Sequence, residues 1–375
     1  MKVLFVQNIE GIAGSEKYFW QLLPALKLTG VEVEFLCVYK KKYTSICETF
    51  AAELKKKNIP VHSIETSSYI NPFLLVKIKK LIKNEKYDIL HSHLIYADFW
   101  SATLKSFFGL KVKTISTLHG YQEDIYTNFC LEPKSVPKNR YFKVARFCYK
   151  RIDHVYACSY GLKNFFDAIG IETVKPITVI HHGFDYKELE PITNVGNKFV
   201  CSIIGRLIPR KGHELILKQC KRLANEIPNF ELIIVGDGPL KEKLQETIQS
   251  LQCNDFVKFT GEVTNPRSYM NESDIVLVPS YAEGLPLVIF EAMSVSKPVI
   301  AFDTIGAAEV VQNNSTGYLI EPFNENLFCD KIIELSKDNS KIKLMGKEAT
   351  KIVHENFSLK KMTEETIKLY QTFLK

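Results

Sequence analysis

The residues best suited to chemistry include a cluster of cations in the second half of the chain. The turn 205–212 reads Gly-Arg-Leu-Ile-Pro-Arg-Lys-Gly and follows the apolar run 199–204. Two or three fixed cations at the end of a strand suit a diphosphate, because arginine offers a bidentate fork and lysine a point charge. The alternative interpretation is an ordinary solvated basic turn.

Two carboxylates, separated by seven residues, follow further along the chain. Glu283 comes before an expected helix, and we expect Glu291 about two turns inside it, between Phe290 and Ala292. A buried carboxylate without a partner is costly, so Glu291 is expected to bond something specific, such as a pair of sugar hydroxyls. An internal salt bridge is the alternative.

Two glycine turns lie where an anion could bind. The loop 11–16 reads Gly-Ile-Ala-Gly-Ser-Glu and opens a helix, where backbone N–H groups can approach an anion. A plain turn between a strand and a helix would look the same. The loop is not G-x-G-x-x-G, and Glu34 lies inside the second expected strand rather than at its end, so a dinucleotide cofactor is disfavoured. The second turn, Gly-Asp-Gly-Pro at 236–239, follows the apolar run 230–235.

The histidines divide into one candidate site residue and two pairs. His119 ends an apolar run at a glycine and is expected to point into a cleft. The pair His91 and His93 is expected to face opposite ways, and the adjacent pair at 181 and 182 to diverge as well. Because no cysteine or acidic ligand set accompanies them, a metal site is not expected.

The elements that must position these residues form two series. Apolar runs at 2–7, 32–38, 88–92, 113–118 and 154–158 alternate with helical spacing, as at 16–27 and 74–83. A second series has runs at 199–204, 230–235, 257–259, 275–278 and 299–302. Such alternation predicts parallel sheets covered by helices on both faces. We expect an N-terminal domain at 1–185, a linker at 186–198, a C-terminal domain at 199–356, and a last helix at 357–375 that can pack on either domain, including back onto the first.

Composition supports this reading. The 375 residues are 46% apolar and 24% charged, which fits two domains and excludes wholesale disorder. Residues 1–7 turn polar too soon for a signal peptide, and no uncharged apolar run approaches the roughly 18 residues of a membrane span. The nine cysteines form no C-x-x-C pair and are expected to be reduced thiols of a cytoplasmic protein.

Together these motifs resemble the retaining glycosyltransferases of family 4. Glu283 and Glu291 are similar to the E-x7-E signature of that family, and the turn 205–212 to its G-R-L-x-x-x-K-G. The turn 236–239, His119 with Gly120, the segment 88–93 and the loop 13–16 resemble further motifs of the family, in the family's order. The resemblance implies the GT-B fold, an α/β architecture of two Rossmann-like doubly wound domains facing a cleft. The acceptor would bind the first domain and a nucleotide-sugar the second.

The resemblance also implies roles for individual residues. Arg206 and Lys211, with Gly14 and helix N-terminal amides, would stabilise the departing diphosphate without Mg²⁺. His119 would help to position the sugar and its developing charge. Glu283 would hold the hydroxyls of the donor sugar and Glu291 the ribose. The implied catalytic residues are His119, Arg206, Lys211 and Glu283, and the implied donor-binding residues are Gly14, Gly205, Arg206, Lys211, Gly236, Gly238, Glu283, Gly284, Leu285, Leu287 and Glu291.

The implied function is transfer of a hexose or N-acetylhexosamine from a UDP- or GDP-sugar, with retention, to a glycan or lipid-linked acceptor. Bacterial surface polysaccharide assembly is the expected pathway, and no cofactor is expected. Two other classes stay open: a nucleotide-sugar epimerase of similar fold, and a catalytically inactive sugar-nucleotide sensor. Four positions depart from the family pattern, with Ala13, Ser296 and Ile305 in place of glycine and His182 in place of asparagine.

The charge of the chain is uneven. Residues 1–190 hold 27 Lys and Arg against 19 Asp and Glu, a balance of +8, whereas residues 191–375 hold 22 against 23. Basic residues gather with apolar ones at 73–86 and 138–151, which favours peripheral binding to an anionic membrane surface. The alternative is that the apolar faces cover the sheet and the lysines meet only water. Nucleic acid is not an expected partner, because the motifs assign the cleft to a nucleotide-sugar.

Overall fold

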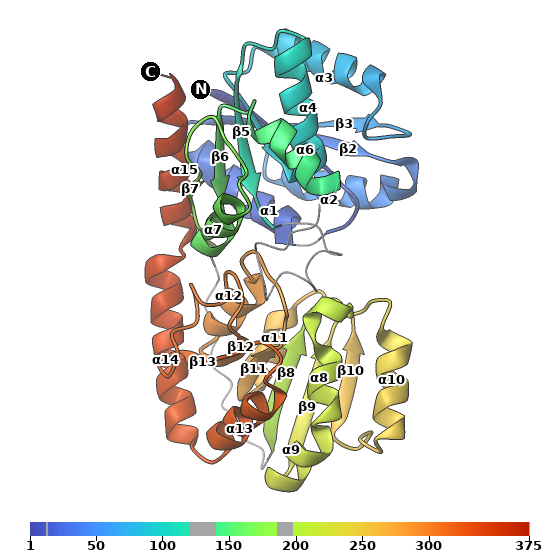
Figure 1. The fold of residues 1–375 in the computed structure, drawn as a ribbon, viewed down its shortest axis with the longest axis vertical. Coiled ribbons are helices and arrows are strands. Elements are labelled where there is room, and N and C mark those ends of the chain that lie inside the picture. The colour runs from blue at the N-terminus through green and yellow to red at the C-terminus, as the bar shows by residue number, and fades with distance from the viewer. Residues whose placement is uncertain (13, 121–139, 186–197, 375) are drawn as a thin grey trace. The chain divides into compact units, whose positions relative to one another are not determined.

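Two parallel sheets account for the two series of apolar runs (Figure 1). The structure, a computed structural model, describes residues 1–12, 14–120, 140–185 and 198–374. These form two units, one of residues 1–120, 140–185 and 357–374 and the other of residues 198–356. Ala13, and all of the expected linker except Lys198, lie outside the described residues.

The sheet of the first unit has the strand order β3-β2-β1-β4-β5-β6-β7, and every described pairing in it is parallel. Because the strands are parallel, their carboxyl ends lie along one edge, where ligands of such sheets bind. Its strands are β1 (Lys2–Asn8), β2 (Glu32–Tyr39), β3 (Val61–Glu65), β4 (Ile89–His93), β5 (Lys113–Leu118), β6 (His154–Ala157) and β7 (Thr178–Val179).

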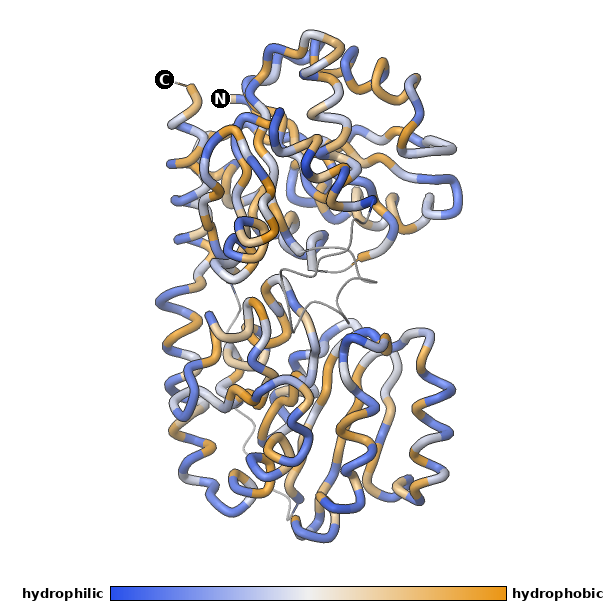
Figure 2. Tube along the Cα trace, in the orientation of Figure 1, coloured by the Kyte–Doolittle hydropathy of each residue, from blue (hydrophilic) through white to orange (hydrophobic). Residues whose placement is uncertain are grey.

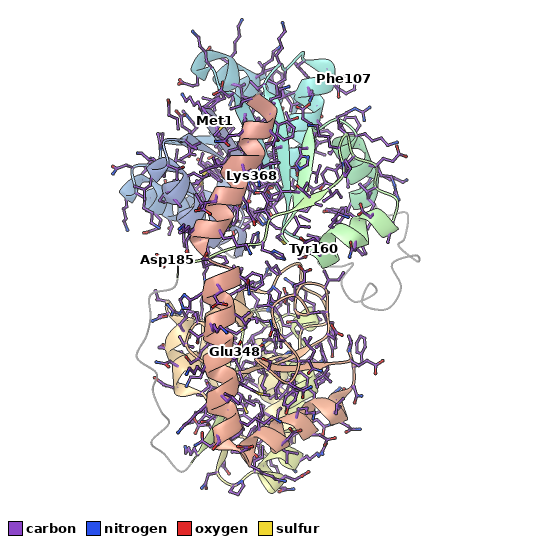
Figure 3. All side chains as sticks on the ribbon, turned by 90° about the vertical axis from the view of Figure 1, so that its left-hand side faces the viewer. Met1, Phe107, Tyr160, Asp185, Glu348 and Lys368 are labelled. Atoms are coloured by element: carbon purple, nitrogen blue, oxygen red, sulfur yellow. The ribbon has the colours of Figure 1, made fainter. Side chains whose placement is uncertain are left out.

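Helices cover both faces of this sheet. Helices α1, α2 and α15 share one apolar core with alternate residues of β1 and β2, including Phe5 and Phe35. Helices α3 and α4 share a second core with the intervening residues, such as Leu4 and Leu36. Figure 3 shows α15, on which Lys368 is labelled, running along the first unit. The helices are α1 (Gly14–Leu28), η1 (Lys41–Tyr43), α2 (Thr44–Lys56), α3 (Pro72–Glu85), α4 (Leu94–Phe107), α6 (Arg140–Tyr149), α7 (Tyr160–Ala168) and α15 (Leu359–Leu374).

The second unit repeats the architecture with the strand order β10-β9-β8-β11-β12-β13. Its strands are β8 (Phe199–Ile204), β9 (Phe230–Val235), β10 (Val257–Gly261), β11 (Ile275–Val278), β12 (Val299–Phe302) and β13 (Gly317–Ile320). Its helices are η4 (Pro209–Lys211), α8 (His213–Lys218), α9 (Cys220–Glu226), α10 (Lys241–Ser250), α11 (Pro266–Glu272), α12 (Leu287–Met293), α13 (Glu325–Ser336) and α14 (Asn339–Asn356).

Hydropathy explains how this unit packs. The strands of its sheet are mostly hydrophobic along their length, whereas α10 alternates hydrophobic and hydrophilic residues (Figure 2). Helices α8, α9, α10 and α13 bury their apolar residues in one large core with the sheet. Ser296, where the resembled family has glycine, has a φ of +59°, in the left-handed region that glycine favours.

Two further findings bear on the sequence analysis. Within the described residues, no helix is both long and apolar enough to cross a membrane. The eight described cysteines are buried free thiols, and Cys130 lies outside the described residues.

Candidate functional site

The basic turn after β8 is held against the end of β11 by a glycine. Gly212 has a φ of +69°, and a Cβ atom there would lie 1.9 Å from the carbonyl oxygen of Pro279. Only glycine fits this position, so the turn that carries Arg206 and Lys211 is fixed beside the loop that carries Glu283. Arg206 is exposed, whereas Lys211 is half-buried.

The turn after β9 packs against the basic turn that follows β8. A Cβ atom on Gly236, whose φ is +141°, would lie 2.0 Å from the carbonyl oxygen of Gly205. The amide of Leu207 donates to the carbonyl of Asp237 at 2.9 Å. The predicted residues Gly205, Gly236 and Gly238 therefore belong to two interlocked turns at the carboxyl ends of adjacent strands.

Glu283 is the buried centre of a charged cluster. Its side chain accepts from Lys211 Nζ at 2.6 Å and from Arg210 Nη1 at 3.1 Å. Burial alone would raise the pKa of Glu283, but the neighbouring Lys211 and Arg210 charges outweigh that effect and hold the pKa below its ordinary value. The carboxylate is thus ionised at neutral pH and can accept further hydrogen bonds.

Arg210 is a member of this cluster that the sequence analysis did not select. Besides Glu283, its Nη1 donates to the carbonyl of Ala282 at 3.1 Å. Its position one residue before Lys211 was visible in the sequence, but the direction of its side chain was not.

The second predicted carboxylate lies on α12. Glu291 is half-buried, and its neighbours Phe290 and Ala292 are buried. Glu291 is four residues after Leu287, the first residue of α12, so it lies about one turn inside the helix and the expectation of two turns was wrong. Of the other predicted donor-binding residues, Gly284 and Leu285 are buried before this helix and Leu287 is half-buried at its first position.

In the first unit, α1 begins at the predicted Gly14. The following Glu16 is buried, and its carboxylate accepts from Gln7 Nε2 at 2.5 Å and from Ser15 Oγ at 3.0 Å. Gln7 comes from β1, so these bonds tie the start of α1 to the carboxyl end of that strand.

The histidines of this unit form a cluster. His91 and His93 lie on the same face of β4, with ring centroids 4.3 Å apart, so the expectation that they face opposite ways was wrong. Side chains two residues apart on a strand share a face, and the period of two was the signal that was misread. His119 is hydrogen-bonded to His93 at 2.8 Å and to His182 at 3.1 Å.

These histidines are neutral at neutral pH. Burial lowers the pKa of His119 to about 3 and holds the pKa values of His91, His93 and His182 well below their ordinary value. Within the described ranges, no group of three or more His, Cys, Asp or Glu residues could hold a metal ion.

Comparisons with known proteins agree with this geometry. The profile of "Glycosyltransferase Family 4" matches residues 12–188, and that of "Glycosyl transferases group 1" matches residues 186–352. An Escherichia coli UDP-Gal:alpha-D-GlcNAc-diphosphoundecaprenol alpha-1,3-galactosyltransferase is 24% identical over 99% of this chain and 96% of its own. The N-acetyl-alpha-D-glucosaminyl L-malate synthase of Bacillus anthracis is 26% identical over 85% of each chain.

A solved structure shares the whole fold. The crystal structure of Anabaena HepE in complex with UDP-glucose superposes with a TM-score of 0.82 and 22% identity, over 99% of this chain and 100% of its own. The fold is therefore GT-B, with two Rossmann-like α/β domains. Because the two profiles together span residues 12–352, the chain belongs to the group 1 glycosyltransferases of the family 4 type, and it is a glycosyltransferase.

Proposed function

We propose that this glycosyltransferase moves a hexose or N-acetylhexosamine, with retention of configuration, from a UDP-sugar to a glycan or lipid-linked acceptor. The observation that carries the proposal is the cluster of Glu283, Lys211 and Arg210 in interlocked glycine turns at the carboxyl ends of β8, β9 and β11. Such strand ends are where ligands of doubly wound sheets bind. The names of the relatives support the donor, because the Escherichia coli enzyme uses UDP-galactose and HepE was crystallised with UDP-glucose.

The cations of the cluster suit the departing diphosphate. Breaking the bond between the sugar and the phosphate places negative charge on the leaving oxygens, which fixed cations stabilise. Lys211 carries three donors and uses one on Glu283, so it can bridge that carboxylate and a phosphate. Arg206, exposed on the same turn, offers a bidentate fork. These groups supply the charge that a metal ion would otherwise provide, so we propose that transfer is independent of metal.

The two carboxylates would share the recognition of the donor. Glu283, held ionised by its two cations, would accept hydrogen bonds from hydroxyls of the sugar. Glu291, on the helix that follows, would accept from the ribose hydroxyls. The departing phosphate would take the proton of the acceptor hydroxyl, so no separate base is needed.

A panel of UDP- and GDP-sugars, with and without lipid-linked and glycan acceptors, tests this proposal. We expect release of UDP that depends on an acceptor and continues in EDTA. Interconversion of the donor sugar without release of UDP would identify the epimerase, and binding without turnover would identify the sensor. Loss of activity in EDTA that Mg²⁺ or Mn²⁺ restores would contradict metal independence.

If the acceptor is lipid-linked, binding to the membrane would bring the enzyme close to it. Helix α3 presents a candidate surface for such binding. Several apolar residues of this helix, including Leu74 and Ile78, are buried in the core that it shares with the sheet. This agrees with the alternative in which the apolar face covers the sheet and the lysines meet only water. Phe73 is nevertheless 77% exposed and Val76 55%, with Ile70, just before the helix, 67% exposed. The exposed lysines beside them are Lys77, Lys80 and Lys83.

We therefore propose peripheral binding of this face to an anionic bilayer, where each basic residue contributes about 1 kcal/mol. In the other basic cluster, Lys138 lies outside the described residues, and Phe142 and Tyr149 are buried, so α3 is the better candidate. Changing Lys77, Lys80 and Lys83 to Glu should abolish salt-sensitive cosedimentation with phosphatidylglycerol vesicles. The same change at Lys343, Lys347 and Lys351, exposed on α14, is the matched control. Equal loss in both variants, or no preference of the unaltered protein for anionic vesicles, would contradict the proposal.

A further inference from the structure

Three histidines of the first unit form a hydrogen-bonded row whose middle member is the predicted site residue His119. His93 Nδ1 lies 2.8 Å from His119 Nε2, and His119 Nδ1 lies 3.1 Å from His182 Nε2. They come from β4, from the end of β5 and from the segment after β7. Both ring nitrogens of His119 are therefore occupied by other imidazoles.

Aromatic side chains of α1 enclose this row. The ring of Tyr18 lies 5.2 Å from that of His119 and 4.8 Å from that of His182, and the ring of Phe19 lies 4.6 Å from that of His93. The Tyr18 hydroxyl is itself hydrogen-bonded to that of Tyr156 at 3.0 Å. The rings are thus packed in place, and His93 and His182 are buried.

The bonding pattern restricts the tautomers. A neutral imidazole carries one proton, so it donates from one ring nitrogen and accepts at the other. If His119 donates from Nε2 to His93, then His182 must donate from its own Nε2, and His93 must carry its proton on Nε2. If His119 donates from Nδ1, all three carry the proton on Nδ1. The three rings therefore share one tautomer in either state.

The surroundings of the row keep its rings uncharged and leave its two end nitrogens without a hydrogen-bond partner among the described residues. After burial, the groups that lower these pKa values are other histidines: His91, His119 and His182 for His93, and His119 and His181 for His182. Other titratable groups around the row, within the described residues, are the hydroxyls of Tyr18 and Tyr156, which bond each other, and that of Tyr370, which bonds His91. The Cys158 thiol donates to the His119 carbonyl. The end nitrogens, His93 Nε2 and His182 Nδ1, are buried and have no hydrogen-bond partner among the described residues.

We propose that His93 and His182 are positioning residues for sugar transfer, which hold His119 by both ring nitrogens as a neutral imidazole of fixed orientation. This inference rests on the proposed function, and on the role at the sugar that the resemblance implies for His119. His119 then offers a ligand no charge, and it does not take the proton of the acceptor, because neither end nitrogen of the row has a hydrogen-bond partner among the described residues to which a proton could pass.

Nitrogen NMR of the full chain labelled in its histidine rings tests the row directly, with His93→Asn and His182→Asn to assign the signals. Between about pH 5 and 8, the range in which an ordinary histidine titrates, the three rings should stay neutral and share one tautomer. Titration of His119 near its ordinary value, or different tautomers within the row, would overturn the proposal.

Kinetics of His182 variants tests the positioning role. His182→Leu removes the hydrogen bond and should lower kcat by about 10-fold or more with little change in the KM of the donor. It should also add an inflection to the pH profile of kcat, because His119 regains a free nitrogen. His182→Asn, whose amide can still bond His119, should recover most of the lost rate.

The matched control is His154→Leu. His154 is a buried histidine of the adjacent strand β6, bonded to Thr178 at 2.7 Å and outside the row. Its variant should keep both kcat and the pH profile. A folded His182→Leu enzyme with the kcat and pH profile of the unaltered protein would refute the positioning role. If the unaltered protein transfers no sugar to any acceptor, the proposed function fails, and the NMR result still decides the state of the row by itself.

Discussion

The two units bury polar groups near their strand ends in opposite ways. In the second unit, the carboxylate of Glu283 stays charged because Lys211 and Arg210 neutralise it. In the first unit, His93, His119 and His182 stay uncharged because burial lowers their pKa values and because, among the described residues, their ring nitrogens hydrogen-bond only one another. A buried charge needs a counter-ion, whereas a buried imidazole can lose its proton and remain a hydrogen-bonding group.

This difference implies that the two units have different roles in the proposed reaction. In the proposed reaction, the cations beside Glu283 in the second unit meet the negative charge that develops on the leaving diphosphate. The histidine row of the first unit offers orientation without charge. Removing a cation should therefore cost far more activity than removing an imidazole, and the two units should respond differently to pH.

The largest expected effect comes from the cations. Lys211→Ala and Arg206→Ala should each lower kcat/KM by about 10²–10³-fold, the scale of losing one preorganised charge stabiliser. Arg210→Ala should have a smaller effect, because part of its bonding is to the carbonyl of Ala282. Lys241→Ala is the control, since Lys241 forms an exposed pair with Asp237 just after the same turns. Comparable losses in all four variants would mean that the cluster has no special role.

The next effect separates the two carboxylates. Glu283→Gln should lower kcat and relax the choice of sugar, while binding of free UDP stays close to normal. Glu291→Gln should weaken the binding of free UDP, because its proposed partner is the ribose. Calorimetry with UDP is the measurement, and unchanged affinity in the Glu291 variant would refute the ribose assignment.

A moderate effect is expected on stability as the pH falls. The buried histidines have folded-state pKa values below their ordinary 6.5, so their contribution to stability is present above that pH and is lost on acidification toward the folded values. Glu283 has a folded-state pKa below its ordinary 4.5, so its contribution is lost only at lower pH. The second unit buries one histidine of this kind, His213, among its described residues, so hydrogen exchange should show the first unit losing more protection than the second between about pH 6.5 and 5. A greater loss in the second unit would contradict the comparison.

The smallest effect has the opposite sign and lies within the first unit. Burial raises the pKa of Asp98 to about 6, although hydrogen bonds from Ser92 and Tyr149 act to lower it. Because the folded pKa exceeds the ordinary 3.8, this contribution is present at low pH and is lost as the pH rises through 6. From pH 5 to pH 7, the unfolding free energy of the wild type should fall by about 1 kcal/mol relative to Asp98→Asn. A difference that does not change with pH would refute the raised pKa.

Much of the fold was predictable, and the missed strands share a position in their sheets. The strands β8, β9, β11 and β12 match their predicted bounds, because each is a mostly apolar and almost fully buried run. The strands β3, β7 and β13 were not predicted. All three lie at the edges of their sheets. β3 is only partly buried and β7 has two residues, so neither presents a clear apolar period.

The candidate site was predictable in its residue types but not in its contacts. The turns at 205–212 and 236–239 were selected because their residue types and positions suit an anion such as a diphosphate, and Glu283 was assigned to the sugar through the family resemblance. That Lys211 pairs with Glu283, 72 residues away, depends on how Gly212 packs against Pro279, which no local pattern reveals. The histidine row was missed because His93 and His182 were weighed only as members of neighbouring pairs.

The measurement that tests the central claim most directly is proton NMR of the purified enzyme turning over a UDP-hexose with its acceptor. We expect one glycosidic bond to form for each UDP released, with the anomeric configuration of the donor retained, and both signals to fall together by about 10²-fold or more in Lys211→Ala. An inverted product, a changed donor sugar without release of UDP, or full activity in Lys211→Ala would contradict the account.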